Sequence, residues 1–140
     1  MIILLDKILA FIADKFTEAP IVVTKGNVNM PANGWTELAT ISLKAKRRYL
    51  LIGKAGTGNS AQATSNASII LKSGTANVFL EMSQGSFTSA SGHSVGTFAY
   101  IETKTACTVT IRKYNYTSTA YPGGNAMMVA IPVLSGGGVL

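Results

Sequence analysis

The chain has little charge, and its acidic residues gather at one end. Charged residues make up 13% of the 140 residues, about half of the roughly 25% usual in globular domains. Asp6, Asp14 and Glu18 are half of the acidic residues, and no aspartate follows position 14. A surface with so few charges must be covered by serine, threonine, asparagine and glycine, or be partly hidden against other subunits.

Cysteine and histidine are almost missing. The one cysteine excludes an internal disulfide framework, so folding needs no oxidising compartment. Together with one histidine and no aspartate cluster, it cannot build a usual zinc site. Cys107 alternates in phase with Val109 and Ile111, which favours a buried, inert thiol. His93 lies among serines without an acid beside it, which favours an exposed loop residue over a general base.

The usual catalytic signatures are absent too. Glu37, Glu81 and Glu102 are isolated in sequence, so their spacing does not favour the carboxylate pair of a glycosidase. In the glycine-rich range 53–60, Lys54 comes before Gly56 and Gly58, whereas the lysine of a phosphate-binding loop follows the last glycine and directly precedes serine or threonine. We therefore predict a protein that is not an enzyme and has no cofactor or metal.

Residues 2–16 carry the helical spacing of apolar side chains. Pro20 follows soon after and ends the pattern. A helix this apolar is expected to bury its side chains against another surface. That surface could be other copies of the helix in a bundle, the body of the same chain, or a groove on a partner. The predicted oligomer or anchor residues are Leu5, Ile8, Leu9, Ile12 and Phe16.

This segment is not predicted to span a membrane. Asp6, Lys7, Asp14 and Lys15 interrupt it. Sixteen helical residues would reach about 24 Å, short of the roughly 30 Å of the hydrocarbon core. It also lacks the small-residue cleavage site of a signal peptide.

Beyond the helix, hydrophobic residues make up short β-type runs between glycine, serine and asparagine clusters. Such spacing predicts an all-β, antiparallel jelly-roll sandwich. We assign residues 1–19 to the helix, 20–34 to a linker and 35–140 to the sandwich head. The predicted strands lie near 37–43, 48–55, 67–72, 77–82, 94–102, 106–113 and 126–134, with a further short run near 21–24.

Two runs are apolar on both faces. In residues 126–134, Met127, Val129 and Ile131 share one face while Met128 and Ala130 share the other, and residues 98–101 are similar. A strand in a two-layer domain has one face on the core, so the second apolar face needs cover from another subunit. This pattern predicts an oligomer. Pro132 predicts an edge position, a bulge or a break in that last strand.

The body from residue 19 is basic, with ten lysines and arginines against three glutamates. The densest part, residues 44–48, is predicted as a hairpin turn between two strands. Lys46, Arg47 and Arg48, with Lys54 nearby, are the candidate polyanion contacts. A solvated turn or a contact to an acidic partner fits the same residues. Stacking aromatics are not interleaved, so no nucleic-acid partner is expected.

Residues 114–125 are rich in tyrosine, threonine, serine, asparagine and glycine. Tyrosine offers contact area at low entropic cost, and the small polar residues offer adaptable hydrogen bonds, so the mixture is typical of recognition loops. Tyr114, Tyr116, Tyr121 and Asn125 are the candidate ligand contacts. The alternative is that some of these tyrosines pack back on the edge of the sandwich.

Segment order suggests a family. The stretch Thr40-Ile41-Ser42-Leu43, the basic turn and Arg48-Tyr49-Leu50-Leu51-Ile52 resemble the opening of jelly-roll domains related to the C1q and tumour-necrosis-factor fold. The apolar run from Met127 to Leu134 is similar to their last strand. The resemblance covers about residues 35–134, and many such domains occur in bacteriophage fibre and decoration proteins.

This resemblance implies a homotrimer with the helix as stem and the jelly roll as head. It implies a structural protein of a phage virion, assembled in the host cytoplasm, that serves as a short tail or head fibre, a capsid decoration or a receptor-binding head. Other virion proteins would contact the helix, and a host-surface glycan would be the candidate ligand. The stem is short for a fibre, and the acidic calcium-binding clusters of some relatives are missing. The alternative function is a monomeric carbohydrate-binding module, which predicts that sugar quenches the fluorescence of Trp35 or of the tyrosines in residues 114–125.

Overall fold

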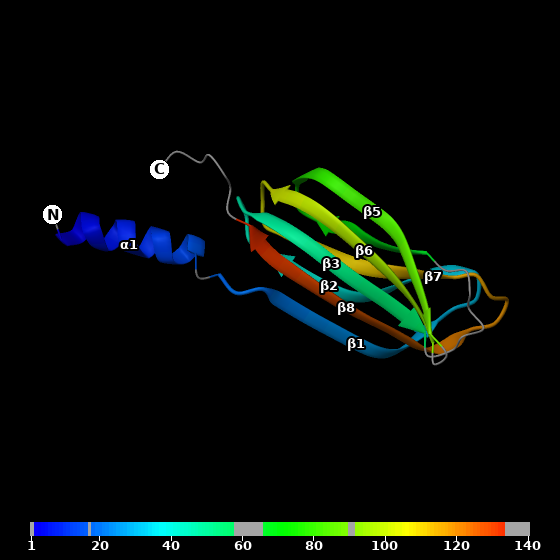
Figure 1. Ribbon diagram of the computed structural model, residues 1–140. Coiled ribbons are helices and arrows are strands. Elements are labelled where there is room, and N and C mark those ends of the chain that lie inside the picture. Colours follow the sequence, from blue (N-terminus) through cyan, green and yellow to red (C-terminus); the bar gives the residue numbers. More distant parts are fainter. Residues whose placement is uncertain (1, 17, 58–65, 90–91, 134–140) are drawn as a thin grey trace.

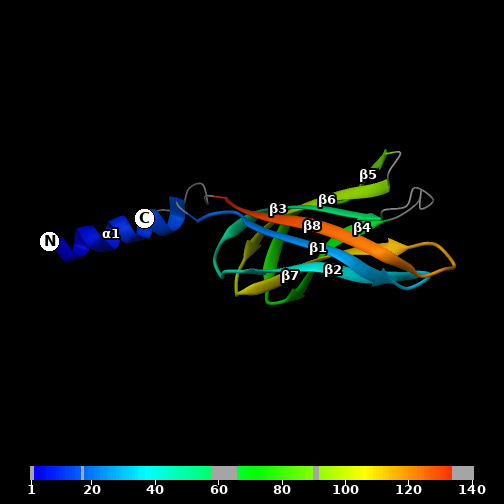
Figure 2. The ribbon, with the colours of Figure 1, turned by 90° about the horizontal axis from the view of Figure 1, so that it is seen from below.

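The computed structural model describes residues 2–16, 18–57, 66–89 and 92–133. In these residues one helix is followed by eight antiparallel strands that form two sheets packed face to face (Figure 1). The helix leaves one end of the sandwich and points away from it (Figures 1 and 2). The elements are α1 (Ile2–Phe16), β1 (Ile21–Met30), β2 (Gly34–Leu43), β3 (Arg48–Thr57), β4 (Ala67–Ser73), β5 (Ala76–Ser89), β6 (Gly92–Thr103), β7 (Cys107–Asn115) and β8 (Tyr121–Val133). An all-β sandwich behind one short helix is therefore confirmed.

The sheets are built from nested strand pairs. The order is β1-β8-β3-β6-β5 in the larger sheet and β2-β7-β4 in the smaller one. Strand β1 pairs with β8, β2 with β7 and β3 with β6, as if a long antiparallel ribbon were rolled up. The innermost pair departs from this scheme, since β5 pairs with β6 and β4 pairs with β7.

Alternation along the strands fills the space between the sheets. Cys107, Val109 and Ile111 point inward from β7 and are buried, as their spacing predicts. Met128 and Ala130 of β8, in the larger sheet, point towards these residues and are buried as well. Strand β8, which is apolar on both faces, thus places one of its two sets of side chains in the core. The rest of this core cluster includes Leu38, Ile41, Leu43, Tyr49, Leu51, Val95 and Ile101.

The range 20–34, predicted as a linker with a short strand near 21–24, needs a correction, because the strand is longer than predicted. Ile21–Met30 forms β1, an edge strand of the larger sheet, and Met30 is fully buried. The strand carries register shifts around Gly26 and Asn27, and Asn27 adopts a positive φ of 56°. Those residues are typical of loops, but here they form a bulge within a paired strand.

Pro132 lies in a strand with a neighbour on each side, because β8 runs between β1 and β3. Its pairing with β1 is first formed at Ala130, opposite Ile21, so Pro132 lies beyond the start of β1. On the β3 side Pro132 is opposite Tyr49. Proline is tolerated because β8 is locally an edge strand at this point.

Candidate functional site

The apolar side chains of α1 are exposed. Leu5, Ile8 and Leu9 keep 55%, 45% and 54% of their surface accessible. Ile12 and Phe16, the other two predicted anchor residues, have side chains outside the described residues. Exposed leucine and isoleucine at helical spacing form an apolar stripe whose contact with water is unfavourable. The helix α1 therefore offers a surface for a partner or for other copies of the chain.

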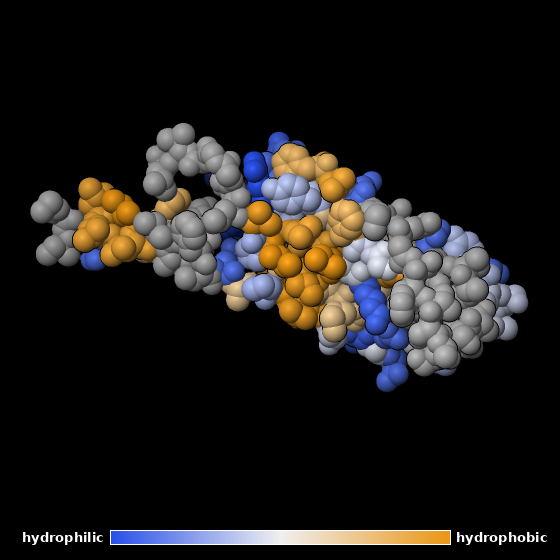
Figure 3. Space-filling view, in the orientation of Figure 1, coloured by the Kyte–Doolittle hydropathy of each residue, from blue (hydrophilic) through white to orange (hydrophobic). Residues whose placement is uncertain are grey.

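The outer face of the larger sheet is also apolar. Register places Ile131, Leu50, Tyr100 and Leu80 side by side across β8, β3, β6 and β5. The next row is formed by Val22, Val129, Ile52 and Phe98 on β1, β8, β3 and β6. We call these two rows the apolar face, and Figure 3 shows apolar residues gathered over this sheet.

Several members of the apolar face are open to solvent, including Val22 at 57% and Ile52 at 45%. The predicted second face of residues 126–134 is therefore real, because Val129 and Ile131 point away from the core that holds Met128. A contiguous apolar surface of this kind on a domain usually marks an interaction site.

An aromatic strip lies on the outer side of the smaller sheet. The rings of Trp35 and Tyr114 are neighbours across β2 and β7, with centroids 5.3 Å apart. Tyr116 continues the strip at 4.3 Å from Tyr114, and the Arg112 guanidinium stacks 4.2 Å from the Trp35 centroid. Trp35 is 40% exposed and Tyr116 is 48% exposed. These rings meet edge to face or tilted, with a cation over one of them, and exposed aromatic surface of this kind suits flat or ring-shaped ligands.

Polar contacts hold this strip in place. Asn66 Nδ2 donates to the Tyr116 hydroxyl at 2.7 Å, and the Tyr114 hydroxyl donates to the Asn33 carbonyl at 3.1 Å. Asn115 is buried beneath the strip; its amide donates to the carbonyls of Pro31 and Thr119, each at 3.0 Å. The hydrogen bonds of Asn115 hold the loop after β7 from the side of the core, and those of the two tyrosine hydroxyls hold their rings in place.

The structure divides the four predicted ligand contacts between the end of β7 and the strand β8. Tyr114 lies in β7 and Tyr116 directly follows it, whereas Tyr121 and Asn125 lie in β8 of the larger sheet. Tyr121 is opposite Met30, and Asn125 is opposite Gly56. The structure instead joins Tyr114 and Tyr116 to residues far away in the sequence.

The basic cluster connects the two sheets, so it is not the predicted hairpin turn: β2 and β3 belong to different sheets. Its cations meet carboxylates of the chain itself. Lys44 Nζ and Arg47 Nε lie 3.3 Å and 3.4 Å from the oxygens of Glu18. Arg48 Nε lies 3.1 Å from Glu102, and this hydrogen bond raises the pKa of Arg48. Internal pairing weakens the case for a polyanion site here.

The remaining predicted cations are separated. Lys46 is exposed at the tip of the turn with a φ of 55°. Lys54 is six residues along β3 from Arg48, about 20 Å away in an extended strand. It lies opposite Met127 and Gly96, at the margin of the apolar face. These four basic residues therefore do not converge on one groove.

Glu18 does more than neutralise the turn. Its side chain is only 10% exposed, and the Tyr49 hydroxyl donates to it at 3.4 Å. Burial is the main cause that raises the pKa of Tyr49. The carboxylate thereby ties the segment after α1 to the end of the sandwich from which the helix leaves.

Histidine, cysteine and acidic residues are scattered over the described part of the chain. It contains no group of three or more histidine, cysteine or acidic residues able to hold a metal ion. Cys107 is buried, and its thiol donates to the carbonyls of Thr105 and Thr75 at 3.2 Å and 3.4 Å. His93 belongs to β6, with its side chain outside the described residues.

Comparisons with known proteins give no relative. No protein-family model, curated protein or solved structure matches the chain. The resemblance to C1q-like jelly rolls therefore stays a prediction. Of the helices in the described residues, none has the length and hydropathy to cross a membrane.

Sequence reasoning missed Arg112 and Glu18 as site residues, and it named Trp35 only as a fluorescence reporter of sugar binding, apart from the four predicted ligand contacts. Trp35 is 79 residues from Tyr114, and only the pairing of β2 with β7 makes them neighbours. One signal was present, since Trp35 and Arg112 each sit at a polar-facing position of an alternating strand. That pattern says which side a residue faces and not which strand lies beside it.

Proposed function

We propose that this protein is a non-catalytic structural and binding protein that assembles as a homotrimer through its apolar face. The observation that carries the proposal is the pair of apolar rows that cross the larger sheet, with Ile52 near their centre. Burying such surface between subunits is favourable by roughly 25 cal/mol per Å² of apolar area. The α1 stem, with its exposed Leu5, Ile8 and Leu9, would assemble with its copies or anchor the trimer on a partner.

The setting that we propose is a phage virion, where the protein would be a short fibre, a capsid decoration or a host-contacting head. The nested pairing of β1 with β8, β2 with β7 and β3 with β6 supports a jelly roll. The virion itself is suggested by the resemblance of residues 35–134 to phage jelly-roll domains. In this arrangement the aromatic strip faces outward, because it is on the sheet opposite the apolar face.

The test is the solution mass of the full chain by light scattering on a sizing column. We expect about three times 14.6 kDa. Ile52→Lys, which puts a charge in the centre of the apolar face, should lower the mass towards that of one chain. Ser42→Lys is the matched control, since Ser42 is exposed on the smaller sheet and should leave the trimer intact. A wild-type chain that stays monomeric at micromolar concentrations contradicts the proposal.

The aromatic strip favours a second candidate function, a carbohydrate-binding module. Trp35 and Tyr116 offer exposed ring faces, and Arg112 and Asn66 place polar groups beside them. Sugar rings stack on such faces while their hydroxyls bond to the polar groups.

Trp35 is the only tryptophan, so its fluorescence reports directly on the strip. A glycan array followed by titration should give a saturable change in this fluorescence, and Tyr116→Ala should weaken binding. Tyr121→Ala serves as control because Tyr121 lies in β8 of the other sheet. A monomer that binds sugar would make the module the main function, whereas a trimer that binds sugar would combine both.

A further inference from the structure

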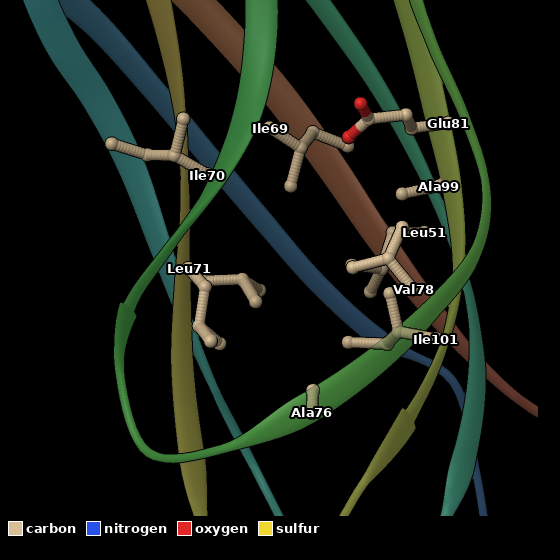
Figure 4. Close-up of a pocket in the computed structure, with 10 residues that line it drawn as sticks. Leu51, Ile69, Ile70, Leu71, Ala76, Val78, Glu81, Ala99 and Ile101 are labelled. Atoms are coloured by element: carbon tan, nitrogen blue, oxygen red, sulfur yellow. The ribbon is translucent and has the colours of Figure 1, made fainter.

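One side of the sandwich is open. The larger sheet has five strands and the smaller one three among the described residues, so the layers do not match in width. Within the part of the chain that the structure describes, β4 ends the smaller sheet and pairs only with β7, and β5 ends the larger sheet and pairs only with β6. Two strands that follow each other in the chain thus diverge from their turn, each with an unpaired backbone edge (Figure 4). We call the space between them the β4–β5 cleft.

The β4–β5 cleft is apolar inside. It contains a cavity of about 240 Å³, larger than the roughly 150 Å³ that suffices for benzene in an engineered apolar cavity. Ile69 and Leu71 line it from β4, and Val78 lines it from β5 (Figure 4). Ala99 and Ile101 of β6 form its floor, together with Leu51 and Val109. A second hollow of about 210 Å³ adjoins it and shares Ile69, Glu81 and Ala99.

A carboxylate faces this apolar space. Val78 is opposite Ile101, and the register then shifts so that Leu80 is opposite Tyr100 and Glu81 is opposite Ala99. The irregularity at Phe79 turns Phe79 and Leu80 to the outer face and returns Glu81 to the inner one. In Figure 4 the Glu81 carboxylate points across the cleft towards Ile69. Glu81 is exposed, and among the described residues its carboxylate makes no ion pair or hydrogen bond, so it is free to pair with a cation of a ligand.

We propose that the β4–β5 cleft binds an extended peptide segment of a partner, which adds to the free edge of β4. The segment would alternate aliphatic and polar residues and would carry one lysine or arginine that reaches Glu81. The edge of β4 supplies backbone hydrogen bonds, the cavity takes every second side chain, and Glu81 supplies the charge partner. This proposal is independent of the trimer, because the cleft opens on the inner side of the larger sheet.

A strand fits these features better than a small apolar ligand does. A small molecule would use the cavity but would leave the edge of β4 unpaired along its length. An added strand satisfies that edge and covers the inner side of β5 and β6, which the narrower sheet leaves open. Inward charges and bulges also discourage edge-to-edge aggregation. If Glu81 and the bulge served only to prevent aggregation, the cleft would bind no added strand at all. A peptide-binding experiment therefore distinguishes protection against aggregation from peptide recognition.

The experiment uses the full chain and a fluorescently labelled, end-blocked hexapeptide in which valine alternates with threonine and lysine occupies one end. We expect sub-millimolar binding by anisotropy, with slower amide hydrogen exchange in residues 67–73. Replacing the lysine by glutamate should weaken binding, and replacing the central threonine by proline should weaken it about tenfold or more, because the ring removes a ladder donor. Glu81→Gln should weaken binding of the lysine peptide about two- to fivefold, as expected for a partly exposed ion pair.

Glu37→Gln is the matched control, since Glu37 is paired with Lys72 on the outer face of the smaller sheet. Absence of binding up to about 1 mM peptide would overturn the proposal, as would binding that proline leaves unchanged. Binding of hexylammonium but not of the peptide would also overturn it, because the site would then be a small-molecule cavity. The decisive comparison is between the lysine peptide and its proline or glutamate variants, all measured with the wild-type protein. The result therefore does not depend on the folding of a protein variant.

Discussion

At the scale of single residues, Lys113 is an unusual member of the core. It points inward from β7 in phase with Val109 and Ile111, and its side chain is fully buried. Burial disfavours the ammonium form and lowers the pKa of Lys113 from 10.5 to about 8. A lysine at a core-facing position of a strand is compatible with folding only if neighbouring groups stabilise its ammonium form or if the amine is neutral.

This lowered pKa predicts that the protein becomes more stable as pH rises. Between about pH 8 and 10.5 the folded protein has released the Lys113 proton while the unfolded chain still holds it, so the unfolded state binds more protons. We expect the free energy of unfolding to increase by about 2 kcal/mol between pH 7 and 9.5. Urea denaturation across this range measures it, and staying below pH 10 avoids the titration of Tyr49, whose pKa is raised.

Lys113→Met should flatten that pH dependence, because methionine fills a similar volume without a titrating group. Lys104→Met, at an exposed position, should keep the wild-type slope. If Lys113→Met and the wild type show the same slope, the amine is not the group responsible.

At the scale of elements, the turn between β4 and β5 packs closely against the start of β7. Gly74 has a φ of 84°, and an added Cβ would meet the Ala106 carbonyl oxygen and lie 2.8 Å from the Cys107 sulfur. Both the backbone conformation and the space thus require glycine. The position of the β4–β5 cleft depends on this residue.

Gly74→Ala should therefore lower the free energy of unfolding by about 2 kcal/mol or more. Gly26→Ala is the matched control, because an added Cβ there meets nothing within 4 Å. That change should be neutral or slightly stabilising. Equal effects of the two substitutions in thermal or urea denaturation would show that the turn adapts to a side chain.

At the scale of the whole molecule, two apolar surfaces are exposed among the residues that the structure describes. The apolar face lies on the larger sheet, and the exposed side of α1 lies beyond the end of the sandwich. Charged residues border the face, with Arg48 paired to Glu102 at one end and Lys54 near the other. Such a polar border around an apolar centre is the usual composition of a protein interface.

Because the proposed interface is apolar, self-association should withstand salt. Raising sodium chloride from about 0.1 M to 1 M shortens the Debye length from about 10 Å to 3 Å, which weakens charge pairs but not apolar contacts. Light scattering should show an unchanged or larger mass at high salt. A trimer that dissociates with salt would point instead to Arg48, Lys54 and the basic turn as the interface.

Local patterns predicted most of the elements. The spacing of Leu5, Ile8 and Leu9 predicts α1, and the alternation of Cys107, Val109 and Ile111 predicts both β7 and its buried side. The prediction of a linker over 20–34 needed correction because Gly26 and Asn27 have loop-type composition. A bulge uses the same residues as a loop, so composition could not distinguish them.

The sequence by itself determined the class of fold, the short apolar helix, and which side chains point inward along each strand, because these follow from contacts between near neighbours in the chain. Only the tertiary structure decided which strands became neighbours. It joined Trp35 to Tyr114 and Arg112, paired the basic turn with Glu18, and placed Tyr121 and Tyr114 in strands of different sheets. It also left β4 and β5 apart, with Glu81 turned inward. Strand order depends on how all layers pack together, and alternation with a period of two is the same whichever strand lies beside it.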